Sequence, residues 1–171
     1  MATGLSNKLV GQTGEYLVCA ELGRRGLIAT SFTGNVPEYD LLVCDDSLRT
    51  LPIQVKTTSA TSWPSDASKW LEIEIDDEEK KQINHGPKEI EYPDLVYVCV
   101  ALGNSQSEDR FFICLKSDIQ DSCIAAYRRF MDPKDWKRPR NYKSLDNRYE
   151  VTDLERFENN WELIRERLTN L

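Results

Sequence analysis

The sequence predicts an α/β fold in which helices flank a mixed central β-sheet. Apolar residues recur with helical spacing at both ends of the chain, and several alternating or wholly apolar runs between them are typical of strands. The order of these segments is not a regular βαβ repeat, which favours a sheet with both parallel and antiparallel neighbours. With 171 residues, the chain is expected to form one domain over residues 1–171.

Four helices are expected, over residues 6–25, 76–85, 118–131 and from 152 to about 168. In the first, apolar side chains recur every three or four residues, and Gly26 after two arginines is a typical end. Asp76 can cap the second, which would leave His85 at a helix end, where a polar or cationic residue is usual. The last begins at the capping box Thr152–Glu155 and carries one apolar stripe.

Six strands are expected, at residues 27–32, 39–44, 51–57, 69–75, 94–102 and 110–116. A turn is expected at Thr33–Asn35, between the first two strands. The fourth strand alternates apolar and acidic residues, which predicts one buried face. The fifth is apolar almost throughout, so it is expected inside the sheet, paired with the sixth in a central hairpin.

Composition argues against several classes of function. No apolar run approaches the roughly 20 residues of a membrane helix, and the N-terminus lacks the apolar core of a signal peptide. A cytoplasmic protein with no membrane partner is therefore expected. The single histidine, His85, argues against metal sites built from two or three histidines. Five cysteines without a CxxC pair argue against a disulfide framework or a zinc site.

The net charge of −7 argues against simple non-specific binding of nucleic acid, but the charge is unevenly placed. Residues 128–148, which include an expected loop from Asp132 to Arg148, carry eight basic and three acidic residues, a net charge of +5, so the rest of the chain carries −12. This basic segment either binds nucleic acid through phosphate contacts and stacking rings or balances an acidic body. Its candidate nucleic-acid-binding residues are Lys134, Lys137, Arg138, Arg140 and Lys143.

Two neighbouring predicted strands bring three polar side chains to one place. Side chains alternate along a strand, so Gln54 and Lys56 share one face. If the turn between the strands is centred on Ser47, Asp40 lies opposite Gln54, and paired residues have Cβ atoms about 4.5–5.5 Å apart. Glu15, on a partly apolar side of the first helix, is a fourth candidate, because a buried carboxylate needs a partner or a metal.

Glycines in the first helix bear on the same site. Gly11 and Gly14 lack side chains, so they would let this helix approach a strand closely, at a cost in helix propensity.

These side chains suit the hydrolysis of a phosphodiester bond. Mg²⁺ or Mn²⁺ takes oxygen ligands, of which Asp40 would supply an anionic one and Gln54 a neutral one. The cation would lower the pKa of an attacking water and stabilise charge on the phosphoryl oxygens. Lys56 would orient or deprotonate that water, or neutralise the developing charge.

The same residues carry a family resemblance. Gly14-Glu15, Glu21–Gly26, Pro37-x-x-Asp40 and Gln54-x-Lys56 resemble the PD-(D/E)XK nuclease superfamily, most of all its Holliday-junction-resolvase-like and Mrr-like branches. The resemblance covers about residues 9–58. It implies a restriction-endonuclease-like fold and a metal-dependent endonuclease, with DNA as the expected substrate and RNA as an open alternative. It also implies the roles of the site residues: metal ligands Glu15, Asp40 and Gln54, and catalytic residue Lys56.

Two departures from the family pattern leave alternatives open. Gln54 stands where the signature has Asp or Glu, which weakens metal affinity unless Glu15 compensates, and two residues separate Pro37 from Asp40. Glu38, expected on the same strand face as Asp40, is a substitute ligand. The alternative function is a non-catalytic module of the same fold that binds nucleic acid or a protein partner, so enzymatic activity itself stays open. A third is a toxin- or defence-associated subunit, and a homodimer or a companion protein is a further open partner.

Overall fold

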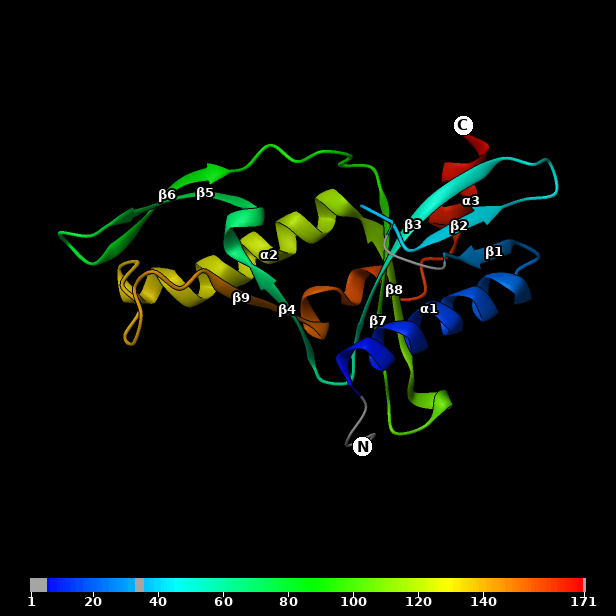
Figure 1. Ribbon diagram of the computed structural model, residues 1–171, viewed down its shortest axis with the longest axis horizontal. Helices are drawn as coiled ribbons and strands as arrows, with labels where there is room; N and C mark the ends of the chain where they lie inside the picture. The colour runs from blue at the N-terminus through cyan, green and yellow to red at the C-terminus, as the bar shows by residue number, and fades with distance from the viewer. Residues whose placement is uncertain (1–5, 33–35, 171) are drawn as a thin grey trace.

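The computed structural model describes residues 6–32 and 36–170, and a five-stranded sheet in the order β1-β2-β3-β7-β8 lies at its centre (Figure 1). Within this sheet β3 and β7 run parallel, and the other three neighbouring pairs are antiparallel. The predicted α/β class with a mixed central sheet flanked by helices is confirmed. The strands of this sheet are β1 Ile28–Ser31, β2 Leu41–Cys44, β3 Thr50–Thr58, β7 Val96–Ala101 and β8 Arg110–Leu115.

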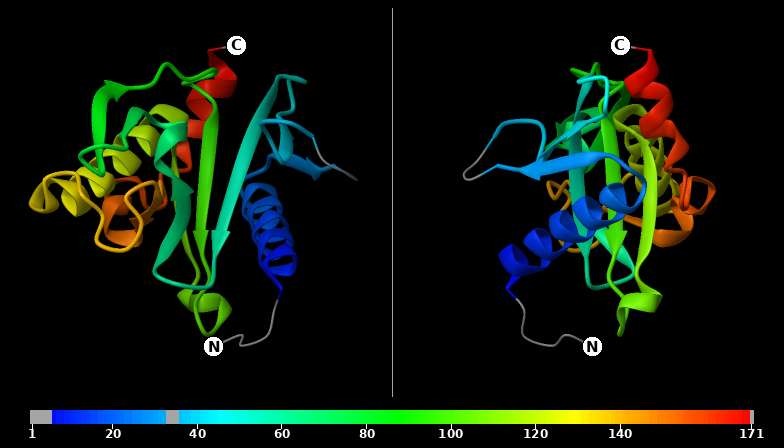
Figure 2. Two further views of the ribbon diagram at one scale, coloured as in Figure 1. Left: turned by 60° about the vertical axis from the view of Figure 1, so that its left-hand side comes forward. Right: turned by 90° about the vertical axis from the view of Figure 1, so that its right-hand side faces the viewer.

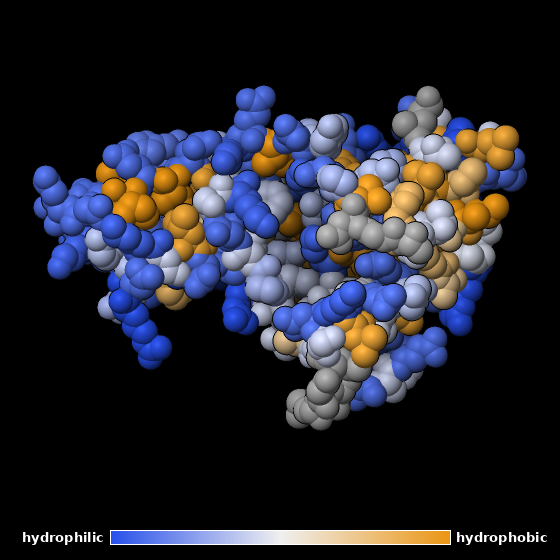
Figure 3. All heavy atoms as spheres, in the orientation of Figure 1, coloured by the Kyte–Doolittle hydropathy of each residue, from blue (hydrophilic) through white to orange (hydrophobic). Residues whose placement is uncertain are grey.

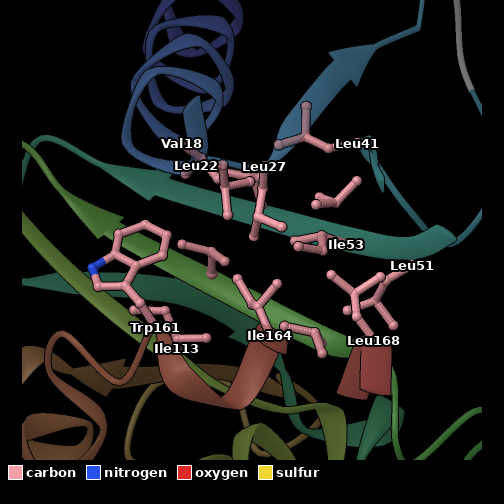
Figure 4. Packing of buried hydrophobic residues seen from close by; sticks show 14 of the residues in the cluster. Val18, Leu22, Leu27, Leu41, Leu51, Ile53, Ile113, Trp161, Ile164 and Leu168 are labelled. Carbon is pink, nitrogen blue, oxygen red and sulfur yellow. The ribbon is translucent and has the colours of Figure 1, made fainter. Parts of the chain in front are cut away.

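Helices cover both faces of the sheet. The helices are α1 Asn7–Arg24, α2 Lys116–Met131 and α3 Glu162–Thr169. Helices α1 and α3 pack on one face and α2 on the other (Figure 2). Figure 4 shows the first of these layers, where Val18 and Leu22 of α1 meet Ile53 of β3 and Ile164 of α3. None of the helices in residues 6–32 and 36–170 is long and apolar enough to cross a bilayer.

Strand β7 is buried on both faces, as its apolar sequence predicts. Successive side chains of a strand point to opposite faces. Val96, Val98 and Val100 therefore pack in the layer of α1 and α3, whereas Tyr97 and Cys99 pack in the layer of α2. One strand thus joins the two halves of the core.

Two small sheets extend from the central one along α2 (Figure 1). Their strands are β4 Ser62–Asp66 and β9 Asp146–Glu150, which pair with each other, and β5 Leu71–Asp76 and β6 Lys81–Pro87, which form a hairpin. The β4–β9 pair was not predicted, because it joins segments far apart in the chain and neither has a strong alternation. The other matched elements agree with their predicted boundaries to within two residues, and the predicted turn at Thr33–Asn35 lies outside the described residues.

The expected helix from Asp76 to His85 is wrong. Asp76 ends β5, and its carboxylate accepts hydrogen bonds from the backbone N–H groups of Glu78 at 3.0 Å and Glu79 at 2.9 Å. The same contact that caps a helix also closes a tight turn, and the chain here returns as β6. His85 therefore lies in a strand, where its Nε2 is 2.9 Å from an oxygen of Glu74.

The helix expected from residue 152 is also wrong, because α3 begins only at Glu162. Two short 3₁₀ turns precede it, and the Asp153 carboxylate accepts from the backbone N–H of Glu150 at 2.7 Å. The apolar stripe is buried, but on two faces: Leu154 packs in the layer of α2, and Ile164 in the layer of α1. A single straight helix could not reach both.

The chain between these two layers passes around β8, where the backbone N–H of Asn159 donates to Phe111 O at 2.8 Å.

The hairpin of β7 and β8 is not central, contrary to the expectation, because β8 is the last strand of the sheet.

Candidate active site

The predicted pairing of Asp40 with Gln54 agrees with the register of β2 and β3. Leu41 lies opposite Ile53 and Leu42 opposite Pro52, so the next position places Asp40 opposite Gln54. The backbone N–H of Asp40 donates to Ile53 O at 2.9 Å, and the Gln54 side-chain amide is hydrogen-bonded to the Asp40 carboxylate. Asp40 lies just before β2, whereas the expected strand 39–44 includes it.

The Asp40 carboxylate is held at the point where β2 leaves the edge of β3. Its Oδ2 accepts a hydrogen bond from the backbone N–H of Val55 at 2.8 Å. Val55 lies beyond the last residue of β3 that pairs with β2, so the Asp40 side chain takes the place of a strand partner for the Val55 N–H. This contact fixes the carboxylate beside β3.

The Gln54 amide lies between two oxygen atoms. Its Nε2 donates to Asp40 Oδ2 and also lies 3.3 Å from Val55 O. The amide nitrogen, and not the oxygen expected of a metal ligand, therefore faces Asp40. A donor in this place satisfies both acceptors, and a cation there would require the amide to turn its oxygen inward.

Helix α1 brings Glu15 to the same edge of β3. The helix crosses the strand where Gly14 packs directly against Thr57, as the expected close approach at this glycine requires. Gly11, by contrast, faces open space. Burial and, next in size, the Asp40 carboxylate raise the pKa of Glu15, whereas the Lys56 ammonium opposes this change. The three charged groups are thus close enough to interact, and the structure brings all four candidate side chains together.

Replacing Glu15 with glutamine should stabilise the protein at neutral pH, by up to about 1 kcal/mol for a partly exposed charge. An acid whose pKa is raised by folding stabilises the native state at low pH, and this contribution is lost as the pH rises through the raised pKa. Glutamine removes the charge and hence the penalty. Urea unfolding of both proteins at neutral and acidic pH measures the effect. An advantage of Glu15→Gln that grows toward acid pH would contradict the electrostatic coupling.

Gln54 and Lys56 face a cleft of about 470 Å³ on the α2 side of the sheet. Figure 3 shows this face hollowed between the central sheet and the part of the chain that carries β4 and β5. Residues of the opposite wall include Lys69, Trp70 and Lys88. This wall could not be recognised in the sequence, because it comes from a 3₁₀ turn and from the segment after β6, which only the fold places opposite β3.

Glu38 lies at the rim of this cleft and does not share a strand face with Asp40, so that expectation is wrong. Its backbone is in the left-handed region, with φ of 73°, outside any strand. Its carboxylate pairs with Lys116 Nζ at 3.2 Å, and the same ammonium donates to Glu91 O at 2.8 Å. Glu38 and Lys116 therefore tie the loop before β2 to the segment before β7.

The basic segment lies at the other end of the molecule from β2, beside the β5–β6 hairpin (Figure 1). Lys137 pairs with Glu79 at 3.8 Å, and Lys143 pairs with Asp77 at 2.7 Å. Several of the five predicted contacts to nucleic acid are thus engaged within the protein. Arg138 is hydrogen-bonded to Ser144 and Asp146, Lys134 lies over the ring of Phe130, and Arg140 lines a shallow pocket beside them. Binding of nucleic acid by this segment stays a prediction.

The oxygen donors at the site suit a hard divalent cation. In the part of the chain that the structure describes, no group of three or more His, Cys, Asp or Glu side chains is arranged to hold a metal ion. Magnesium sites, however, commonly use one or two carboxylates and complete the shell with water and substrate phosphates. Glu15 and Asp40 meet this requirement, and Gln54 and the Val55 carbonyl are neutral donors beside them. Burial is the main cause of the raised pKa of Glu15, and a cation would relieve the second cause, repulsion by the Asp40 carboxylate.

Comparison with known proteins adds a likeness of fold. No family model matches the sequence, and no curated protein matches it. One solved structure that resembles the chain is that of a bacterial homing endonuclease, I-Ssp6803I. The two share 15% sequence identity and superpose with a TM-score of 0.42, over 68% of this chain and 74% of the endonuclease. A likeness at this level assigns neither an activity nor a site to the present chain.

Proposed function

We propose that residues 1–171 form a single PD-(D/E)XK nuclease-like domain that hydrolyses phosphodiester bonds in DNA with Mg²⁺ or Mn²⁺. The observation that supports this most is the convergence of an acid pair, an amide and an ammonium where β2 leaves β3. Strand register brings Asp40 to Gln54, and the helix crossing brings Glu15 to Asp40 and Lys56. Helix α1 and the segment before β2 each deliver one member of the set that the sequence motif predicts, and β3 delivers two.

In this proposal Asp40 and Glu15 hold the divalent ion, with the Gln54 amide as a neutral ligand. When bound, the ion lowers the pKa of a water molecule and stabilises charge on the phosphoryl oxygens. The Val55 N–H keeps the Asp40 carboxylate in one orientation, so the carboxylate needs little reorganisation during the reaction.

Lys56 has a separate part. It is exposed on the same face of β3 as Gln54, and its backbone carbonyl accepts from Trp63 Nε1 at 3.0 Å, which anchors this part of the strand to β4. Its ammonium is free to orient the attacking water or to neutralise charge that builds on the phosphate. The two acids and the lysine thus approach one phosphate from the edge of β3.

The alternative function is a module that keeps this fold and binds nucleic acid or a protein partner without catalysis. Gln54 favours it, because a neutral amide stands at the position of the signature acid and its nitrogen already faces Asp40. The two functions differ in whether Asp40 binds a metal ion. In either case a second copy or a companion protein stays a prediction.

Cleavage of supercoiled plasmid DNA by the purified protein, with Mg²⁺ or Mn²⁺, tests the proposed function. The wild type should nick or linearise the plasmid, and Asp40→Asn should not. Equal activity of the two proteins would mean that the cleavage comes from a contaminant or from another site.

A further inference from the structure

The cleft beside the candidate site is small. Its volume of about 470 Å³ is in the range of pockets that hold a single small ligand, roughly 300–1,000 Å³. Gln54, Lys56 and Tyr97 line it on the side of the sheet, and Lys69 and Lys88 line it on the opposite wall. One or two nucleotides of a single strand fit such a space, whereas an intact duplex does not.

The wall opposite the sheet is fixed to α2. The Gln120 side chain donates to Lys88 O at 2.7 Å and to Trp70 O at 3.1 Å. The backbone N–H of Lys88 donates to the same Trp70 carbonyl at 2.9 Å. Lys116 adds the contact to Glu91 O at 2.8 Å. These hydrogen bonds oppose any widening of the cleft to admit a duplex.

Four lysines line the cleft, and one of them, Lys116, is already paired with Glu38. Lys56, Lys69 and Lys88 are exposed, and within residues 6–32 and 36–170 no carboxylate lies within ion-pair distance of their ammonium groups. Lys137 and Lys143, by contrast, pair with acids of the β5–β6 turn. A lysine without an acidic partner can neutralise a phosphate and release its counterion without first breaking an ion pair.

We propose that the DNA strand to be cut enters this cleft unpaired, and that Lys69 and Lys88 bind its phosphates opposite Lys56. The inference rests on the proposed function, since it specifies the substrate of the same site. An unpaired strand presents its backbone to both walls and leaves the complementary strand outside. The preferred substrates are therefore DNA molecules with a single-stranded region, such as a flap, a gap or a frayed end.

Fluorescence anisotropy in EDTA, where no cleavage occurs, tests binding with a labelled single strand and the blunt duplex of the same sequence. The wild type should bind the single strand at least about ten-fold more tightly. In a plot of log binding constant against log salt concentration, Lys69→Ala/Lys88→Ala should make the slope about 1.4 less steep, because each of two lost phosphate contacts contributes roughly 0.7. Lys80→Ala/Lys81→Ala removes the same charge at the β5–β6 hairpin, outside the cleft and the predicted binding residues, and should bind like the wild type. Thermal unfolding of both variants checks that they are folded.

Equal affinity for the duplex, or an equal loss in the control variant, overturns the inference. A cleavage assay on a flap substrate and on plasmid separates this failure from failure of the proposed function. If the protein binds both forms equally and cleaves fully paired DNA in an Asp40-dependent way, the proposed nuclease function holds and the proposed preference for a single strand is wrong. If the single strand binds through Lys69 and Lys88 but no substrate is cleaved, the proposed binding in the cleft holds and the proposed nuclease function is wrong.

Discussion

Replacing Asp40 with asparagine is expected to lower metal-dependent cleavage of DNA by at least about 100-fold, since even residues behind the metal ligands cost 10–100-fold. The substitution removes the negative charge that a hard cation needs. Asparagine keeps a side-chain oxygen that can accept the Val55 N–H, so the entry into β2 should survive. The rate of plasmid nicking and the melting temperature, measured on the same preparation, separate loss of chemistry from loss of fold.

Asp77→Asn is the matched control for this substitution. Asp77 lies in the turn of the β5–β6 hairpin, where it pairs with Lys143, away from the candidate site. The same change of charge there should leave cleavage at the wild-type rate. Similar losses in the two variants would show that net charge, and not the site, controls activity.

Replacing Gly14 with alanine is expected to destabilise the protein by about 1–3 kcal/mol, as overpacking usually does. A Cβ atom at this position would lie 1.8 Å from Thr57 Oγ1 and 2.8 Å from Thr57 Cβ, so α1 or β3 must move. The better helix propensity of alanine returns at most about 1 kcal/mol. Because Glu15 follows Gly14 directly, the movement should also reduce cleavage. Urea unfolding measures the change in stability.

Gly11→Ala provides the comparison in the same helix. A Cβ atom at Gly11 meets nothing within 4 Å, so this substitution should stabilise the protein by up to about 1 kcal/mol through helix propensity alone. If Gly14→Ala were as stable as Gly11→Ala, the close contact between α1 and β3 would be disproved, and with it the placement of Glu15.

The pairing at the site could be predicted because it depends on local features. A short connection between two strands and the alternation of side chains fix the register, and these place Asp40 opposite Gln54 without knowledge of the rest of the fold. The close approach of α1 to β3 could be predicted for a similar reason, since a glycine beside an apolar helix face is a recognisable signal. Only Gly14 makes this contact, and the sequence does not distinguish it from Gly11.

The cleft could not be predicted, because tertiary contacts alone create it. Lys69 and Lys88 come from segments with no sequence relation to β3, and Gln120 holds them opposite it. The same limit explains the end of the chain. The capping box predicted at Thr152 does not form, because Glu150 and Asp153 make the box here, and the apolar stripe is buried but divided between two faces of the sheet. Periodicity shows that side chains are buried, and it does not show against which layer.

Titration calorimetry with Mn²⁺ tests most directly whether Asp40 and Glu15 share one ion-binding site. The wild type and the control Asp77→Ala should each bind Mn²⁺ at a site that is absent from Asp40→Ala and from Glu15→Ala. Unchanged binding by Asp40→Ala, or loss of binding in Asp77→Ala instead, would contradict the proposed site and leave the non-catalytic module as the better description of this fold.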